Sequence, residues 1–262
     1  MIKQGMKTSQ PRISIVVPTY NERENIGKLI ELLAEYLKEH DYEIVVVDDN
    51  SPDGTAEVAE SYSFKHPVKV VRRPGKMGLT SAIYDGVKNA SGDVIVVMDA
   101  DLQHPPSLVP RLVSKIQECD VVIASRYSKE GGIERWNLTR KLISLGAVLV
   151  TRLLVQECRG VKDPVSGFFA ARREVISRWK PIVPEGYKAL VEILSTAKPR
   201  RVCEEPYVFK GRSSGKSKLG SRVVLLHIKL LFKLHPSLVT AFTILVALLL
   251  SLLIWLCAKS IF

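Results

Sequence analysis

Short apolar runs alternate with longer amphipathic segments over most of the chain. The apolar runs are rich in β-branched residues, which is typical of strands buried on both faces of a sheet. These runs cover residues 13–17, 43–47, 68–71, 94–98 and 121–124. The segments between and after them have helical periodicity and cover residues 22–39, 55–61, 80–90, 107–118 and 138–155. This alternation predicts an α/β fold with a Rossmann-like, mixed but mostly parallel sheet and helices on both faces.

The C-terminal part of the chain has a different pattern. Residues 237–258 contain no charged residue and are about as long as a helix that crosses a bilayer core. A buried core helix of that length would normally show a polar stripe, and here only scattered Ser and Thr interrupt the apolar residues. We therefore expect one C-terminal transmembrane helix. Basic residues precede it and only Lys259 follows, so the positive-inside rule places the preceding domain in the cytoplasm.

The segment just before this span predicts a helix in the membrane interface. Lys229 and Lys233 are four residues apart and share one face of an otherwise apolar stretch. Such a helix suits the interface, with its lysines reaching lipid phosphates, and a core helix with an exposed edge is the alternative. The expected organisation is a flexible tail, one domain, an amphipathic interfacial helix and a single transmembrane helix, at residues 1–11, 12–218, 219–235 and 237–258.

The positive charge is concentrated beside the predicted span. The chain of 262 residues has a net charge of +11, and residues 199–236 carry nine Lys and Arg against only Glu204 and Glu205. Such an excess needs an anionic partner, which could be nucleic acid, a phosphorylated substrate or anionic lipid. Nucleic-acid modules usually interleave basic and aromatic residues, and this run contains only Tyr207, Phe209 and Phe232. We therefore expect membrane lipid as a partner and no nucleic acid.

The composition suggests a hydrophobic core of ordinary size, and the cysteines suggest a reducing compartment. The chain is 46% hydrophobic, which is ample for a sizeable core. Its four cysteines, at positions 119, 158, 203 and 257, form no C-x-x-C pair and no cluster with histidine. We expect them to be unpaired, buried side chains in a reducing compartment, and neither a disulfide frame nor a zinc site.

Carboxylates follow directly after two of the predicted strands. Asp48 and Asp49 end one strand, and Asp99 and Asp101 end another. The carboxyl ends of parallel strands form the ligand-binding edge of such sheets, so these residues are expected to lie near one another. Two carboxylates one residue apart repel each other and need a positive charge close by. Aspartates are hard oxygen ligands that suit Mg²⁺ or Mn²⁺, with Gln103 adding a neutral oxygen, and such a site can bridge to a diphosphate.

Other phosphate-binding and hydrolytic motifs are missing from the sequence. There is no G-x-x-x-x-G-K-[ST] loop, no G-x-G-x-x-G after the first strand and no H-E-x-x-H. The expected phosphate site is therefore the metal-dependent one at the strand ends.

An ordered set of segments resembles a known enzyme family. The set is PTYNE at 18–22, VVVDDNSPDG at 45–54, KMGL at 76–79, MDADLQHPP at 98–106, SRY at 125–127, VSGFF at 165–169 and KGRSSGKSKL at 210–219. It is similar to the inverting GT-A glycosyltransferases of family 2, over about residues 13–222. One departure is Lys210-Gly-Arg212, because many members have an acidic residue before the arginine.

The resemblance implies roles for residues that match the family's motifs. The nucleotide-binding residues would be Pro18, Tyr20, Glu22, Asp49, Lys76 and Asp99. The metal ligands would be Asp99, Asp101 and Gln103, and the catalytic residues Asp101, Arg126, Arg212 and Lys218, the last two from a mobile loop. The acceptor side would be lined by Asp163, Ser166 and Gly167.

The resemblance also implies a substrate class. The set is most similar to members that transfer mannose from GDP-mannose to dolichyl or polyprenyl phosphate, with Mg²⁺ or Mn²⁺, at the cytoplasmic membrane face. Transfer from UDP-glucose or another nucleotide sugar to the same lipid is an alternative. A membrane-tethered scaffold that binds anions without catalysis is an alternative of another class. A single span would also allow a membrane-protein partner or a homo-oligomer.

Overall fold

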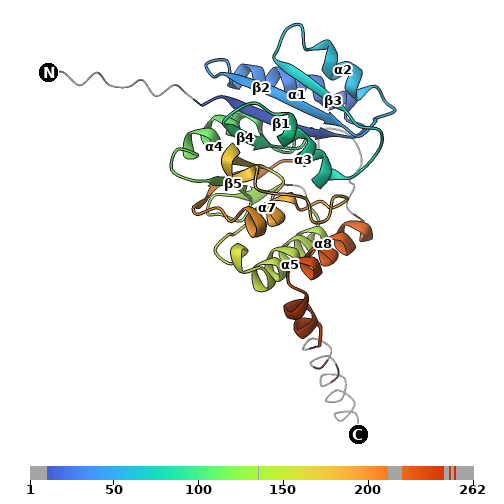
Figure 1. Ribbon diagram of the computed structural model, residues 1–262, viewed down its shortest axis with the longest axis vertical. Helices are drawn as coiled ribbons and strands as arrows, with labels where there is room; N and C mark the ends of the chain where they lie inside the picture. Colours follow the sequence, from blue (N-terminus) through green and yellow to red (C-terminus); the bar gives the residue numbers. More distant parts are fainter. Residues whose placement is uncertain (1–10, 135, 212–219, 245–247, 249–250, 252–262) are drawn as a thin grey trace, which may run out of the picture.

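The protein is built on a seven-stranded mixed sheet (Figure 1). The computed structural model describes residues 11–134, 136–211, 220–244, 248 and 251. The strand order is β3-β2-β1-β4-β7-β5-β8, and β7 is antiparallel to both of its neighbours. The strands are β1 (Ile13–Thr19), β2 (Tyr42–Asp48), β3 (Val68–Arg72), β4 (Val94–Val97), β5 (Val121–Ser125), β7 (Phe169–Arg172) and β8 (Val202–Pro206). The other strand pairs are parallel, which confirms the predicted mixed, mostly parallel sheet.

Helices cover both faces of this sheet (Figure 1), as the apolar strand pattern predicts. The helices are α1 (Arg23–Tyr36), α2 (Thr55–Ser61), α3 (Leu79–Asn89), α4 (Val109–Lys115), α5 (Leu138–Leu154), α6 (Arg173–Ile176), α7 (Ala189–Ala197) and α8 (Ser221–Leu234). Neighbouring strand residues point to opposite faces: Ile15 packs in one apolar core with α1 and α4, and Val16 in the other with α3 and α7. Short 3₁₀ turns at Pro106–Leu108 and Gln156–Cys158 and a small pair of strands, β6 (Gly132–Ile133) and β9 (Val208–Phe209), complete the fold.

The sheet topology brings the predicted strand-end residues together. β1 pairs with β2 on one side and with β4 on the other, so the strand order reverses at β1. The chain leaves the carboxyl ends of these three strands at Tyr20, Asp49 and Met98, which directly precedes Asp99. This edge is the topological switch point at which ligands bind in open α/β sheets.

Helices α5 and α8 lie together beneath the sheet and lead to the C-terminus (Figure 1). Thr151 on α5 and His227 on α8 are hydrogen-bonded, with 3.0 Å between Oγ1 and Nε2. Lys229 forms an ion pair with Glu185, and the Lys233 ammonium donates to the Ile182 carbonyl at 3.0 Å. In the structure both lysines contact the loop before α7, and the expectation that they reach lipid phosphates stays a prediction.

The predicted membrane span is only partly within the described residues. In the parts of the chain that the structure describes, no single helix is long and apolar enough to cross a membrane. Helix α8 and a helix at Pro236–Ile244 pass that test as a pair, with a bend of 118° between them. Most of 245–258 and the predicted tail at 1–11, apart from residue 11, lie outside the described residues, so both remain predictions.

The cysteine prediction was wrong for two residues. Cys119, just before β5, and Cys203, in β8, form a disulfide with their Cα atoms 6.1 Å apart. Because β5 and β8 are parallel neighbours, with Val122 opposite Cys203, the fold brings together two cysteines that are 84 residues apart. Sequence spacing alone does not reveal such a pairing. Cys158 is free and buried as expected, and Cys257 lies outside the described residues.

Candidate active site

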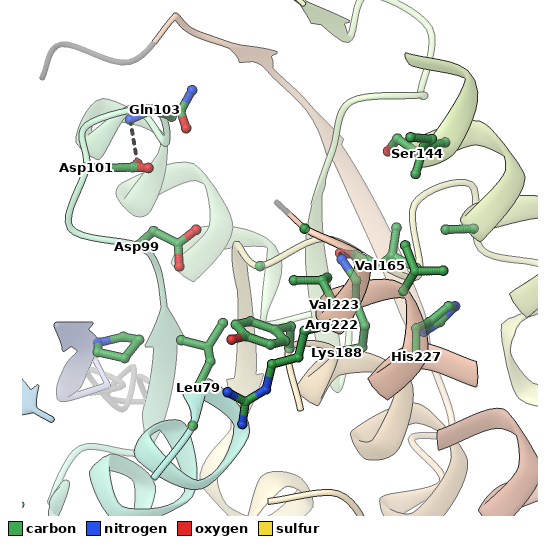
Figure 2. Close-up of a pocket in the computed structure, with 18 of the residues that line it drawn as sticks. Leu79, Asp99, Asp101, Gln103, Ser144, Val165, Lys188, Arg222, Val223 and His227 are labelled. Atoms are coloured by element: carbon green, nitrogen blue, oxygen red, sulfur yellow. Dashed lines mark hydrogen bonds between the residues drawn. The ribbon is translucent and has the colours of Figure 1, made fainter. Parts of the chain in front are cut away.

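One cavity of about 770 Å³ extends from the carboxyl ends of β1 and β4 to helices α5 and α8. Figure 2 shows its two aspartates on one side and His227 of α8 on the other. Most of the predicted site residues line it: Pro18, Tyr20, Glu22, Asp49, Lys76, Asp99, Asp101, Gln103, Arg126 and Gly167. Asp163 and Ser166 are buried behind its wall, and Arg212 and Lys218 lie outside the described residues.

The end of the cavity near β1 combines an aromatic ring with charged groups. The Lys76 ammonium lies 3.9 Å from the centre of the Tyr20 ring, a cation–π contact that orders both side chains. Asp49 accepts a hydrogen bond from the Gly78 amide at 3.3 Å and forms an ion pair with Arg73. A flat ring and a fixed carboxylate suit a nucleoside, which offers a base to stack on and hydroxyl or N–H groups to donate.

Arg73 was not predicted from the sequence and holds Asp49 in place. Its side chain is almost completely buried, and its guanidinium contacts Asp49, Asp85 at 3.0 Å and the Ser81 hydroxyl at 2.7 Å. The adjacent Arg72 points to the surface and pairs with glutamates of α2. No feature of the sequence separates the two arginines, because the alternation of β3 and the turn after it decide which one faces inward.

The turn after β4 presents a donor set that fits a divalent cation. Asp99 is partly exposed to the cavity, and Asp101 is buried with its Oδ1 accepting from the Gln103 amide at 3.1 Å (Figure 2). The side chain of Gln103 donates to the Lys210 carbonyl at 2.9 Å. Among the described residues no three His, Cys, Asp or Glu side chains form a metal-binding cluster. Two carboxylates and an amide oxygen instead suit Mg²⁺ or Mn²⁺ that takes further oxygens from water or a diphosphate.

His104 packs beneath this turn as a neutral group. Its ring stacks on Phe168 with centroids 5.1 Å apart, and its Nδ1 accepts from the Asp99 amide at 3.2 Å. Burial lowers the pKa of His104 to about 4, and this effect exceeds the opposing influence of Asp101. At neutral pH His104 therefore supports the turn without supplying positive charge to the aspartates.

Arg126 and Asp163 form a buried ion pair in the cavity wall. The guanidinium donates through Nε and Nη2 to the two carboxylate oxygens, each at 2.8 Å, and the Arg126 amide adds a third bond at 3.0 Å. The fully buried Asp163 thus fixes the position of Arg126 and does not itself face the cavity. Ser166 likewise donates to the Ala124 carbonyl at 2.8 Å, so its contribution is to the shape of the loop.

The sequence did not predict the part of the cavity that helices α5, α7 and α8 form. Arg140 and Ser144 lie one turn apart on α5, Lys188 precedes α7 and His227 belongs to α8. The Arg140 guanidinium lies 4.1 Å from the Trp136 ring centre, and the Ser144 hydroxyl accepts from Tyr127 at 2.8 Å. The polar pair four residues apart within an apolar helix was the available signal for α5.

Apolar side chains surround these polar groups toward the open end of the cavity. Ile143 and Val150 come from α5, and Val223 and Leu231 come from α8. The cavity therefore joins an acidic, metal-suited end to a cationic centre and an apolar end. Such a space can hold a nucleotide and, next to it, an anion with a hydrocarbon tail.

Comparisons with known proteins give a family for the chain. The family model for glycosyl transferase family 2 matches residues 14–179. The chain is 48% identical over 224 residues to the dolichol-phosphate mannosyltransferase of Pyrococcus furiosus, which covers 85% of this chain and 63% of that enzyme. It thus spans less than two thirds of that relative. It is also 33% identical over 236 residues to the dolichol-phosphate mannosyltransferase of Saccharomyces cerevisiae, covering 85% of this chain and 86% of the relative.

A solved structure supports the fold. Glucosyl-3-phosphoglycerate synthase from Mycobacterium tuberculosis, in complex with Mn²⁺, UDP and glucosyl-3-phosphoglycerate, superposes with a TM-score of 0.63 at 22% identity. The match covers 86% of this chain and 80% of that one. At this identity the likeness supports the GT-A-like fold alone. The family match and the two relatives, together with this architecture, place the chain in glycosyl transferase family 2.

Proposed function

We propose that the protein transfers mannose from GDP-mannose to dolichyl or polyprenyl phosphate, with inversion, releasing GDP. The observation that carries this proposal is the single cavity that joins the strand-end aspartates to the apolar space between α5 and α8. The nucleotide occupies the end near Tyr20 and Asp49, and the lipid phosphate enters from the helical end. Relatives named dolichol-phosphate mannosyltransferase support the choice of acceptor and sugar.

The proposed step needs no general base. An oxygen of the lipid phosphate attacks C1 of mannose, and the bond from C1 to the diphosphate oxygen breaks, with its electron pair leaving on GDP. A phosphate monoester has its second pKa near 6, so the attacking oxygen is already deprotonated at neutral pH. The task of the protein is to hold two anions close together, which is a matter of positioning and electrostatics.

The turn after β4 would hold the divalent cation. Asp99, Asp101 and Gln103 are the residues of this chain that fit Mg²⁺ or Mn²⁺ by their oxygens and their place in the cavity. The bound cation would supply Lewis-acid stabilisation of the charge on the leaving diphosphate. Arg212 and Lys218, outside the described residues, are proposed to meet the phosphates as further cations.

The centre of the cavity would hold the acceptor phosphate. Arg126 is fixed there by Asp163, and Arg140 and Ser144 face the same space from α5. A planar guanidinium can donate two parallel hydrogen bonds to phosphate oxygens. These groups offer the positive charge that an anionic acceptor needs beside an anionic donor.

The outer faces of α5 and α8 would lie on the membrane. Exposed leucines follow one another along α5 with helical spacing, and each has between 47% and 72% of its surface exposed: Leu138, Leu142, Leu145, Leu149 and Leu153. Helix α8 adds Leu225, Ile228 and Phe232 to this apolar surface. An exposed apolar surface of this extent is unusual on a soluble protein and marks a contact site. With the predicted span at 237–258 as anchor, the domain would sit at the cytoplasmic face.

The test is sugar transfer by the full chain in detergent, with polyprenyl phosphate and Mn²⁺. Radiolabelled GDP-mannose and UDP-glucose are offered separately, and Asp101→Asn serves as the inactive control. Label that enters lipid from GDP-mannose alone, and not with the control, supports the proposal. Transfer from UDP-glucose would contradict the sugar and nucleotide. Binding of nucleotide without transfer from either donor would contradict the enzymatic role and favour a scaffold.

A further inference from the structure

Lys188 occupies the middle of the cavity and belongs to no motif of the sequence. It directly precedes α7, and its side chain lies between the aspartates of the β4 turn and His227 (Figure 2). Its ammonium donates to the Val165 carbonyl at 3.3 Å, the one hydrogen bond it makes within the described part of the chain. An ammonium has three N–H groups, so two of them remain available to a ligand.

The backbone that carries Lys188 is firmly held. The side chain of Glu192 accepts hydrogen bonds from the amides of Ile182 and Val183, at 2.8 and 3.1 Å. These bonds tie the loop before Lys188 to the first turn of α7. A side chain on such a fixed backbone is pre-organised, as groups that contact a substrate usually are.

The surroundings of Lys188 favour an anion. Burial is the main cause that lowers its pKa to about 8, and the nearby Arg126 lowers it further. Arg126 is itself matched by Asp163 through two hydrogen bonds, whereas no carboxylate among the described residues lies within ion-pair distance of the Lys188 ammonium. Asp99, which favours the charged form of Lys188 from a greater distance, is the residue proposed to hold the metal.

His227 does not share this charge. Thr151 donates its single hydroxyl proton to the Ala147 carbonyl at 2.7 Å, so it accepts from Nε2 of His227. Burial, and then the charge of Lys188, lower the pKa of His227 to about 4, so the ring is neutral at pH 7. Of these two neighbouring side chains, Lys188 is therefore the charged one.

We propose that Lys188 binds the phosphate of the acceptor together with Arg126 and orients the oxygen that attacks the sugar. This assignment rests on the proposed function and adds a residue to its acceptor site. A phosphate monoester dianion supplies oxygens that can accept from the N–H groups of Lys188 that Val165 does not use. It also separates the two cations, Lys188 and Arg126, by negative charge.

The test compares three variants of the full chain in detergent. Lys188→Met removes the charge at similar length, Lys188→Arg keeps a charge, and Lys180→Met changes an exposed lysine as the matched control. Binding of citronellyl phosphate, a short isoprenyl phosphate, and of Mn²⁺·GDP is measured by calorimetry, and KM is measured for polyprenyl phosphate.

We expect Lys188→Met to weaken binding of citronellyl phosphate, and to raise KM for polyprenyl phosphate, by about 10- to 100-fold. Mn²⁺·GDP binding stays within twofold, Lys188→Arg restores part of the loss, and Lys180→Met changes nothing. The melting temperature of Lys188→Met is unchanged or higher, because a buried charge has been removed. Unchanged binding of citronellyl phosphate, or an equal loss of Mn²⁺·GDP binding, would overturn the assignment.

The binding measurement also separates this inference from the proposed function. If the unmodified chain binds citronellyl phosphate but transfers no sugar, the proposed function is wrong, and Lys188 is judged on binding alone. If the unmodified chain does not bind the phosphate, the assignment of Lys188 is wrong.

Discussion

At the scale of single residues, the candidate site consists of groups that face the cavity and of buried partners that fix them. Asp49 is held by Arg73, and Arg126 is held by Asp163. Breaking a buried ion pair on one side leaves an uncompensated charge, which is far more costly than losing a surface pair. Changes at the buried partners should therefore affect both stability and binding.

Arg73 and its neighbour Arg72 provide a matched pair for this prediction. Arg73→Met leaves Asp49 buried without its cation, and we expect a loss of about 3–5 kcal/mol in the free energy of unfolding and weaker GDP binding. Arg72→Met removes exposed ion pairs to Glu57 and Glu60, which water and salt screen, and should change the free energy of unfolding far less. Urea unfolding and calorimetry with Mn²⁺·GDP measure both. Equal effects of the two substitutions would contradict the role given to Arg73.

The lowered pKa of His104 leads us to expect that the protein loses stability in acid. Its pKa is lowered to about 4 in the folded chain, whereas an unfolded histidine titrates near 6.5. Between these values the unfolded state binds a proton that the folded state does not, so the free energy of unfolding decreases as the pH falls from about 6.5 toward 4. The contribution of His104 is roughly 3 kcal/mol.

The measurement is urea unfolding at several pH values without divalent cations, for the unmodified chain and for His104→Gln. The difference between the two curves isolates His104 from the carboxylates that titrate in the same range. A difference that does not change with pH would show that His104 is not neutral in the folded protein.

At the scale of elements, α5 is the helix whose placement departs most from its sequence pattern. A row of leucines with helical spacing usually marks a buried face. In the structure this row is exposed, and the core takes Val148, Thr151 and Leu154 from the other side of α5. Helix α5 therefore carries the exposed leucines and also lines the cavity. A membrane contact through these leucines would place the cavity at the lipid surface.

The double substitution Leu145→Glu and Leu149→Glu tests this contact. Both side chains are exposed, so we expect the fold to persist while transfer to polyprenyl phosphate in vesicles falls at least about tenfold, because carboxylates oppose insertion into the lipid interface. Transfer to citronellyl phosphate in detergent should not change, and Thr139→Glu, an exposed polar position on the same helix, is the control. A parallel loss with both acceptors would contradict a membrane role for the row.

At the scale of the whole molecule, the sequence predicted the parallel strands and their ligand edge better than the helical half. Five β-branched runs became β1 to β5, and the aspartates after β2 and β4 reached one cavity because parallel strands end at the same edge. The short strands β7 and β8 have no long apolar run of their own and depend on neighbours for pairing. Arg140, Lys188 and His227 escaped prediction because helix packing alone brings them to the cavity.

The central claim is that a nucleotide sugar and a lipid phosphate share one cavity and enter it from opposite ends. Ala147→Trp places a large ring in the apolar end, on the cavity side of α5, and Lys141→Trp puts the same ring on an exposed part of that helix. The measurement is transfer of mannose to polyprenyl phosphate, alongside Mn²⁺·GDP binding. We expect Ala147→Trp to lose at least about 100-fold in transfer with unchanged Mn²⁺·GDP binding, and Lys141→Trp to keep both. Normal transfer by Ala147→Trp would contradict the claim, because the acceptor would then bind elsewhere.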